Sequence, residues 1–208
     1  MKEYRSVTGK VELRDAEEGE TMQTISGYAA TFNSPTDMGY YVEQIDSAAF
    51  NNADLSDVVS CFNHQLESLL SRNTGNEGDL VLSIDEIGLR YEFKAKNDCA
   101  QECAKNIQLG FVKGSSFVFV ADSESTEYDQ VQPDGRSMDV RTILGIRKVY
   151  ELGPVVFPAY EDTTAESIER SKEFRAKFEA ARPKKVVEPT GKELRESYLI
   201  ELKKNKIK

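Results

Sequence analysis

The chain has 208 residues, of which 39% are hydrophobic and 30% are charged, and its formal net charge is −9 at pH 7. This length and composition fit one globular domain with an appended segment, because the polar content is too high for every segment to cover a core. No apolar run approaches the ~18 residues that cross a bilayer. We therefore expect neither a signal peptide nor a membrane anchor, and we expect a soluble intracellular protein.

The charge is unevenly placed along the chain. Residues 182–208 contain nine Lys or Arg and four Glu, a net charge of +5, so residues 1–181 carry −14. An acidic body argues against nucleic-acid binding. The basic tail is expected to be a solvated, partly helical segment, with contact to acidic surfaces as the alternative.

Alternating apolar and polar residues predict a β-rich first half. The chain begins with a strand in residues 4–14, followed by an acidic turn. Asp46 can cap a short helix that runs through Phe50. Further strands are expected at 24–32, 40–45, 58–62, 79–84 and 89–95, the last two joined as a hairpin.

A helix and an apolar strand follow. Residues 98–109 form the clearest predicted helix, with Asp98 as its cap and with Cys99, Cys103 and Ile107 on one face. The apolar run 117–121 is expected to be a central strand. The remaining predicted segments are a long hairpin loop at 123–136, strands at 139–146 and 148–152, and a closing segment at 154–160.

The character of the chain changes after Thr164. Residues 165–182 are rich in Glu, Lys, Arg and Ala and predict a helix, and 191–206 can form a second, weaker one. We expect a mixed, β-rich fold: about nine strands closing, or nearly closing, a small β-barrel surrounded by a few helices. The predicted domains are the barrel, 1–164, and a charged helical C-terminal extension, 165–208.

The single histidine of the chain, His64, is the first candidate for chemistry. It follows the short apolar strand at 58–62. A serine hydroxyl needs a neighbouring base to become a nucleophile, and histidine is the usual base because its pKa lies near neutrality. The commoner alternative is an exposed loop histidine without a catalytic role.

Two adjacent serines, Ser115 and Ser116, follow Gly114 where a loop enters the most apolar strand. A serine at such a junction can be held rigidly while its hydroxyl faces a cleft, and nearby backbone N–H groups can face an oxyanion. The alternative is a turn serine that satisfies local backbone groups.

Glu151 is a carboxylate within a run of strand residues. It either orients a histidine or faces solvent.

The three cysteines are Cys61, Cys99 and Cys103, and their odd number favours free thiols. Together with His64 they offer a possible zinc set, although Cys103 also falls on the apolar face of its helix. Cys61 as a nucleophile paired with His64 is a further alternative, but the two side chains are expected to point to different faces.

Six sequence blocks, in order, resemble one known family. Residues 25–34 carry its opening G-Y-A-x-x-F-N pattern, and 41–50 resemble its acidic strand before G-A-F, with Ala48 in place of glycine. Phe62-Asn63-His64 matches its histidine block, although Gln65 replaces the usual Asp. The other matching blocks are 71–89, the S-F-x-F block at 114–119 and the closing block at 150–160, in which Leu152-Gly153 replaces Val-Ser. The chain thus resembles the prohead serine proteases of tailed phages.

This resemblance implies a fold similar to that of herpesvirus assembly proteases and cleavage of scaffold or capsid-protein segments inside the immature capsid in the host cytoplasm. It implies Ser116 as nucleophile and His64 as base. Glu151 is the expected third member, with Glu43 in reserve, and Arg141 or Arg147 can assist the oxyanion. The expected partners are the major capsid protein and scaffold as substrates, with self-trimming and a possible homo-oligomer, but no nucleic acid, membrane, cofactor or metal.

One alternative to a protease involves no catalysis. The charged helical extension also fits an interaction segment, so a capsid-assembly or scaffold protein, alone or fused to a protease, is the rival interpretation. Loss of cleavage in a Ser116→Ala variant separates the two.

Overall fold

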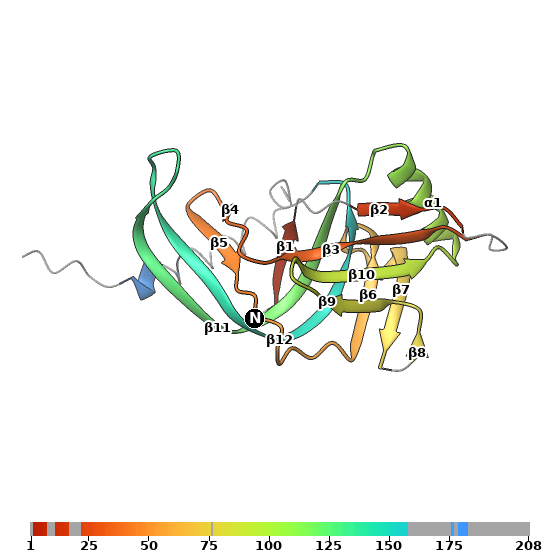
Figure 1. Ribbon diagram of the computed structural model, residues 1–208, viewed down its shortest axis with the longest axis horizontal. Coiled ribbons are helices and arrows are strands. Elements are labelled where there is room, and N and C mark those ends of the chain that lie inside the picture. Colours follow the sequence, from red (N-terminus) through yellow and green to blue (C-terminus); the bar gives the residue numbers. More distant parts are fainter. Residues whose placement is uncertain are drawn as a thin grey trace, which may run out of the picture. The chain divides into compact units, whose positions relative to one another are not determined.

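The computed structural model describes residues 2–7, 11–16, 22–75, 77–157, 176 and 179–182 (Figure 1). The chain divides into two units, Met1–Thr163 and Thr164–Lys208, and the fold below belongs to the first. The helices predicted for the C-terminal extension lie almost entirely outside the described residues, of which 176 and 179–181 are helical. The proposed domain boundary after residue 164 stays a prediction.

Strands dominate the described part of the first unit, which also holds one α-helix and two short 3-10 helices. The helices are η1 (Phe62–His64), η2 (Leu66–Ser68) and α1 (Asp98–Gln108). The strands are β1 (Glu3–Val7), β2 (Val11–Arg14), β3 (Thr24–Thr31), β4 (Thr36–Asp37), β5 (Tyr41–Ile45), β6 (Asp57–Cys61), β7 (Leu69–Thr74), β8 (Glu77–Gly78), β9 (Val81–Ile84), β10 (Gly88–Lys94), β11 (Gly114–Val131) and β12 (Ser137–Val155). No helix in these ranges is long and apolar enough to cross a membrane.

The strands of the described residues form two sheets. One has eight strands, ordered β1-β11-β12-β6-β7-β8, with β5 pairing a different part of β12 and β4 pairing β5. The other has four strands, ordered β2-β3-β10-β9. The predicted β-rich class is confirmed. Neither sheet closes on itself within the described ranges, so the closed barrel stays a prediction.

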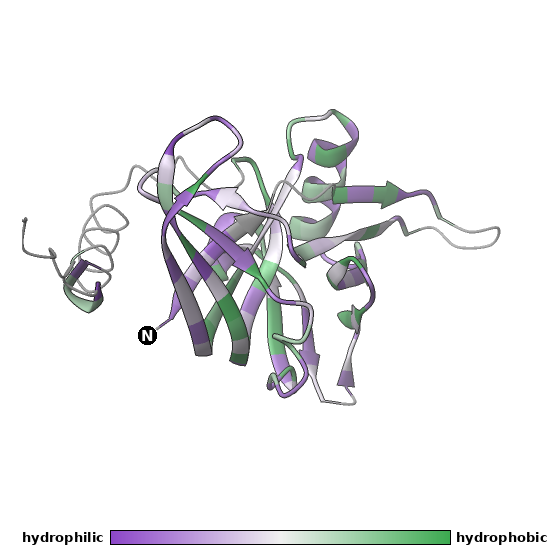
Figure 2. Ribbon diagram, turned by 60° about the vertical axis from the view of Figure 1, so that its left-hand side comes forward, coloured by the Kyte–Doolittle hydropathy of each residue, from purple (hydrophilic) through white to green (hydrophobic). Residues whose placement is uncertain are grey.

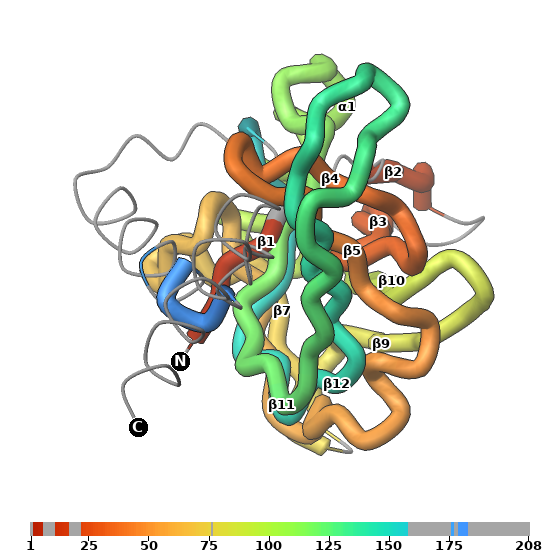
Figure 3. The backbone as a smooth tube through the Cα atoms, turned by 90° about the vertical axis from the view of Figure 1, so that its left-hand side faces the viewer, coloured from red at the N-terminus to blue at the C-terminus, as the bar shows by residue number. Residues whose placement is uncertain are grey.

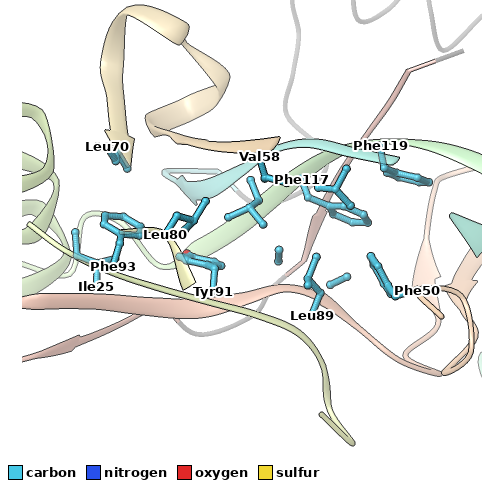
Figure 4. Packing of buried hydrophobic residues seen from close by; sticks show 14 of the residues in the cluster. Ile25, Phe50, Val58, Leu70, Leu80, Leu89, Tyr91, Phe93, Phe117 and Phe119 are labelled. Atoms are coloured by element: carbon cyan, nitrogen blue, oxygen red, sulfur yellow. The ribbon is translucent and has the colours of Figure 1, made fainter. Parts of the chain in front are cut away.

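The hydrophobic core lies between the two sheets. Phe117 and Phe119 of β11 stack with their ring centroids 4.6 Å apart and are fully buried. Tyr91 and Leu89 of β10 lie beneath them, also fully buried (Figure 4). Because successive strand residues point to opposite faces, alternate residues in the first part of β11 face this core and the residues between them face away.

A long two-stranded ribbon replaces the loop that was predicted for residues 123–136. β11 continues to Val131 and β12 begins at Ser137, so the two strands stay paired almost to the connecting turn (Figure 3). Most residues on this distal part are hydrophilic (Figure 2). The prediction was wrong because polar residues are compatible with a paired ribbon as well as with a loop, since strand pairing satisfies backbone groups whatever the side chains. The predicted break between 146 and 148 is likewise absent from the continuous strand β12.

Three local predictions are also corrected. The single strand expected at residues 4–14 is two strands, β1 and β2, which belong to different sheets. At Asp46 the side chain caps a turn, accepting from the Ala48 amide at 2.8 Å, and no helix follows. Helix α1 forms as predicted, but Asn97 rather than Asp98 caps it, accepting from the Ala100 amide at 2.8 Å.

Candidate active site

Ser116 lies near the start of β11, on the face opposite the core. Its neighbour Ser115 points the other way, where its Oγ lies 2.8 Å from the Tyr91 hydroxyl in the buried interior. The strand alternation therefore separates the two adjacent serines, and Ser116 is the one that faces the histidine. Its Oγ lies 2.6 Å from His64 Nε2.

His64 is presented by a sharp turn at the end of β6. Strand β6 runs parallel to β12, with Val59 opposite Glu151, so the turn after β6 reaches the nearby part of β12. Asn63 and His64 both have positive φ angles, 50° and 59°. Such residues cost roughly 1–3 kcal/mol each and persist when the surroundings hold them. Asn63 is held by its Oδ1, which accepts from the Val156 amide at 2.9 Å.

Glu151 lies on the other side of the imidazole. Its Oε2 contacts His64 Nδ1 at hydrogen-bond distance, and its side chain is largely buried. Its other oxygen, Oε1, has no hydrogen-bond partner among the described residues. Since a buried carboxylate needs a partner, His64 is the group that offsets its burial. The structure thus brings together the three residues singled out from the sequence, Ser116, His64 and Glu151.

Glu43, the reserve for the third position, lies in a different cluster. Its carboxylate binds the guanidinium groups of Arg5 and Arg141 and accepts from the Tyr41 hydroxyl at 3.2 Å. Burial alone would raise the pKa of Glu43, but the two guanidinium groups outweigh burial and hold that pKa below its ordinary value. Glu43 therefore stays ionised and is committed to arginine side chains.

Of the two arginines considered for the oxyanion, Arg141 is committed to carboxylates, and the role of Arg147 stays a prediction. Arg141 is 1% exposed and binds the carboxylates of Glu3, Glu43 and Glu124. Arg147 is exposed. Gln65, which stands where the resemblance leads one to expect Asp, is exposed as well, and Glu151 takes the contact with the imidazole instead.

Sequence reasoning missed two neighbours of the site, both on β1. Ser116 Oγ donates a hydrogen bond of 2.9 Å to the backbone carbonyl of Arg5. The Tyr4 ring meets the His64 ring edge-on, with centroids 5.4 Å apart. The alternation in residues 4–14 indicated a strand here, but nothing in the pattern indicated which strand it would pair with.

The structure does not gather the three cysteines around His64. Among the described residues, no group of three or more His, Cys, Asp and Glu side chains is placed to hold a metal ion. Cys61 and Cys103 are buried, while Cys99 is exposed despite its expected place on the apolar face of α1. His64, the fourth member of the supposed set, contacts Glu151 and Ser116.

The three thiols are expected to differ sharply in reactivity. Burial raises the pKa of Cys103 to about 12, and burial together with the negative charges of Glu151 and Glu67 raises that of Cys61 to about 12. Ellman's reagent should therefore modify Cys99 in the native protein and all three thiols in denaturant. A Cys99→Ser variant is the control and should lose the fast reaction. Rapid modification of Cys61 in that variant would contradict the assignment.

The comparisons with known proteins agree with the geometry. The sequence model of the family described as Caudovirus prohead serine protease matches residues 9–177, which include all three residues of the candidate site. No curated protein and no solved structure matches the chain. The resemblance inferred from six short blocks is thereby confirmed over most of the sequence. The chain belongs to the Caudovirus prohead serine protease family.

Proposed function

We propose that this chain is a serine endopeptidase that cleaves scaffold or capsid-protein segments inside the phage procapsid during head maturation. The observation that carries the proposal is the Ser116 Oγ–His64 Nε2 distance of 2.6 Å, with Glu151 on the other imidazole nitrogen. Membership of the family supports the choice of substrates and the location in the procapsid within the host cytoplasm. Trimming of its own extension, 165–208, is part of the proposal.

In the proposed mechanism, Ser116 Oγ attacks the carbonyl carbon of the scissile peptide while His64 Nε2 takes the hydroxyl proton. Glu151 holds the imidazole with Nδ1–H directed toward its carboxylate and stabilises the imidazolium that forms. His64 then returns the proton to the leaving amine, and an acyl-enzyme remains on Ser116. Water, deprotonated by His64, hydrolyses this ester. Backbone N–H groups near Ser116 are the proposed donors to the oxyanion.

Covalent labelling tests the proposal without knowledge of the substrate. A fluorophosphonate reacts much faster with an activated serine than with an ordinary hydroxyl, forming a phosphonyl ester with loss of fluoride. We expect one label per wild-type chain on Ser116, located by tandem mass spectrometry after prolonged incubation. Ser115→Ala is the matched control, because it removes the adjacent hydroxyl on the core face, and it should be labelled. Ser116→Ala should not.

A different labelling pattern would count against catalysis. If Ser116 stays unlabelled in the wild-type chain and in every variant described below, the serine is not activated. The scaffold interpretation, which needs no nucleophile, would then be favoured.

A further inference from the structure

The N-terminal strand β1 covers the nucleophile. It pairs antiparallel with the start of β11 at the edge of the eight-stranded sheet, with Ser6 opposite Ser116. β1 lies outside residues 9–177, the range shared with the family. Without β1, this edge of the sheet would end with β11, the strand that carries the nucleophile. An exposed strand edge next to a catalytic serine is suited to binding an extended peptide as an added strand.

The backbone of β1 follows the path that such a peptide would take. The carbonyl of Arg5 is hydrogen-bonded to Ser116 Oγ at 2.9 Å, which puts a peptide group directly at the nucleophile. The residue before it, Tyr4, places its ring against His64. A substrate whose scissile carbonyl lay at the position of Arg5 would likewise place its preceding side chain on the imidazole.

The side chains of Arg5 and Glu3 belong to a cluster of charged residues, which also contains Glu43 and Arg141, on the opposite face of the strand. Arg5 binds the buried carboxylate of Glu43, which is 4% exposed, and its Nη2 lies 3.3 Å from the Tyr41 hydroxyl. Glu3, two residues away and so on the same face, accepts from Arg141 Nη1 at 2.6 Å. Glu43 and Arg141 also bind each other at 2.7 Å. Within this cluster Glu43 offers a carboxylate to the cation of Arg5, and Arg141 offers a guanidinium to the anion of Glu3. The two strand residues so bound are two positions apart.

The contact with Arg5 also competes with catalysis. The Ser116 hydroxyl has one proton and two acceptors within reach, the Arg5 carbonyl and His64 Nε2. When the proton is donated to Arg5, the serine–histidine hydrogen bond that begins the reaction is absent. β1 therefore behaves as an occupant of the site and not as a well-placed substrate.

We propose that β1 occupies the substrate site of its own chain, and that the buried pair Glu43 and Arg141 selects peptides with the pattern Glu-x-Arg, cut on the carboxyl side of Arg. The inference rests on the proposed function and adds to it the substrate class and a strand that must leave before substrate enters. Glu43 is then a specificity-determining residue.

Loosening β1 in the full-length chain tests the proposal that this strand occupies the substrate site. Arg5→Ala removes the charged anchor of β1, and we expect the rate of Ser116 labelling by the fluorophosphonate to rise about tenfold, in line with the loss of hydrogen bonds to a charged group. Arg5→Lys keeps the charge and should restore most of the protection. Arg14→Ala is the matched control, because Arg14 lies on β2, is 52% exposed and pairs with Glu92. In this variant Ser116 should be labelled at the wild-type rate. An unchanged or slower rate in Arg5→Ala would mean that β1 merely supports the site.

A separate peptide added to the protein tests the proposed selection of the Glu-x-Arg pattern. The blocked peptide acetyl-Glu-Tyr-Arg-Ser-Val-amide, the sequence of β1, should be cut after Arg by the Arg5→Ala chain or slow its labelling. Peptides with Ala in place of Arg or of Glu should be cut, or should slow the labelling, at least tenfold less effectively. Adding Glu43→Gln should remove the preference for Arg, whereas Glu124→Gln, which touches Arg141 but not Arg5, should retain it.

The two proposals fail differently. If all peptides are cut or inhibit equally and Ser116 in Arg5→Ala is labelled no faster than in the wild type, the inference about β1 is wrong. Labelling of Ser116 would still support the proposed protease function. If Ser116 is labelled in none of the variants, the protease itself is wrong.

Discussion

Replacing His64 with alanine is expected to lower kcat/KM for peptide cleavage by about 10⁴-fold or more. Without the imidazole, the Ser116 hydroxyl loses the base 2.6 Å away and Glu151 loses the group that offsets its burial. The chain has no second histidine to take over this role. Initial rates on a capsid-protein substrate, together with the rate of fluorophosphonate labelling, measure the loss.

Neighbouring variants show whether the loss is specific to the imidazole. Gln65→Ala changes the exposed next residue and should leave kcat/KM within a factor of about two, as expected for a surface substitution. Glu151→Gln keeps the shape of the side chain but removes its charge, and should cost roughly 10³-fold to 10⁴-fold. Activity above a tenth of the wild-type value in His64→Ala would rule out the assigned base.

Replacing Arg141 with alanine is expected to lower the free energy of unfolding by about 3–5 kcal/mol. The side chain is 1% exposed and binds the carboxylates of Glu3, Glu43 and Glu124. Removing it leaves Glu43 buried with Arg5 as its remaining guanidinium partner. Equilibrium unfolding in urea, monitored by circular dichroism, measures the change.

Arg136→Ala is the matched control for this substitution. Arg136 also binds two carboxylates, those of Asp37 and Asp134, but is 52% exposed, so its loss should cost no more than about 1 kcal/mol. Equal costs for the two variants would show that burial does not govern the strength of these ion pairs.

The pKa of Glu43 is lowered in the folded state, so the stability it contributes is present above its unfolded-state pKa and is lost as the pH falls.

Local patterns in the sequence were reliable where the neighbouring residues determine the structure. The hairpin of β9 and β10, helix α1 and the apolar run of β11 are set by alternation, helical periodicity and turn residues close in the chain. The choice of Ser116 over Ser115 rested on the resemblance. It agrees with a strand alternation that places Ser115 on the core face.

Long-range pairing could not be predicted from the same patterns. His64 and Glu151 are 87 residues apart, and only the parallel pairing of β6 with β12 brings them together. Alternation shows that residues 3–7 form a strand, but it carries no information about the partner, so their place beside Ser116 was not foreseen. The ribbon at 123–136 was missed for a related reason, since its stability comes from the opposite strand.

The hydrogen bond between Asn63 and the Val156 amide sets a limit on how far the chain can be shortened. Asn63 holds the turn that presents His64, and its partner lies one residue beyond the end of β12. A C-terminal truncation that removes Val156 would take this support away from the histidine turn, whereas a truncation that ends beyond Val156 leaves it in place. Shortening of the chain from its carboxyl end is therefore expected to preserve the histidine turn only when Val156 is retained.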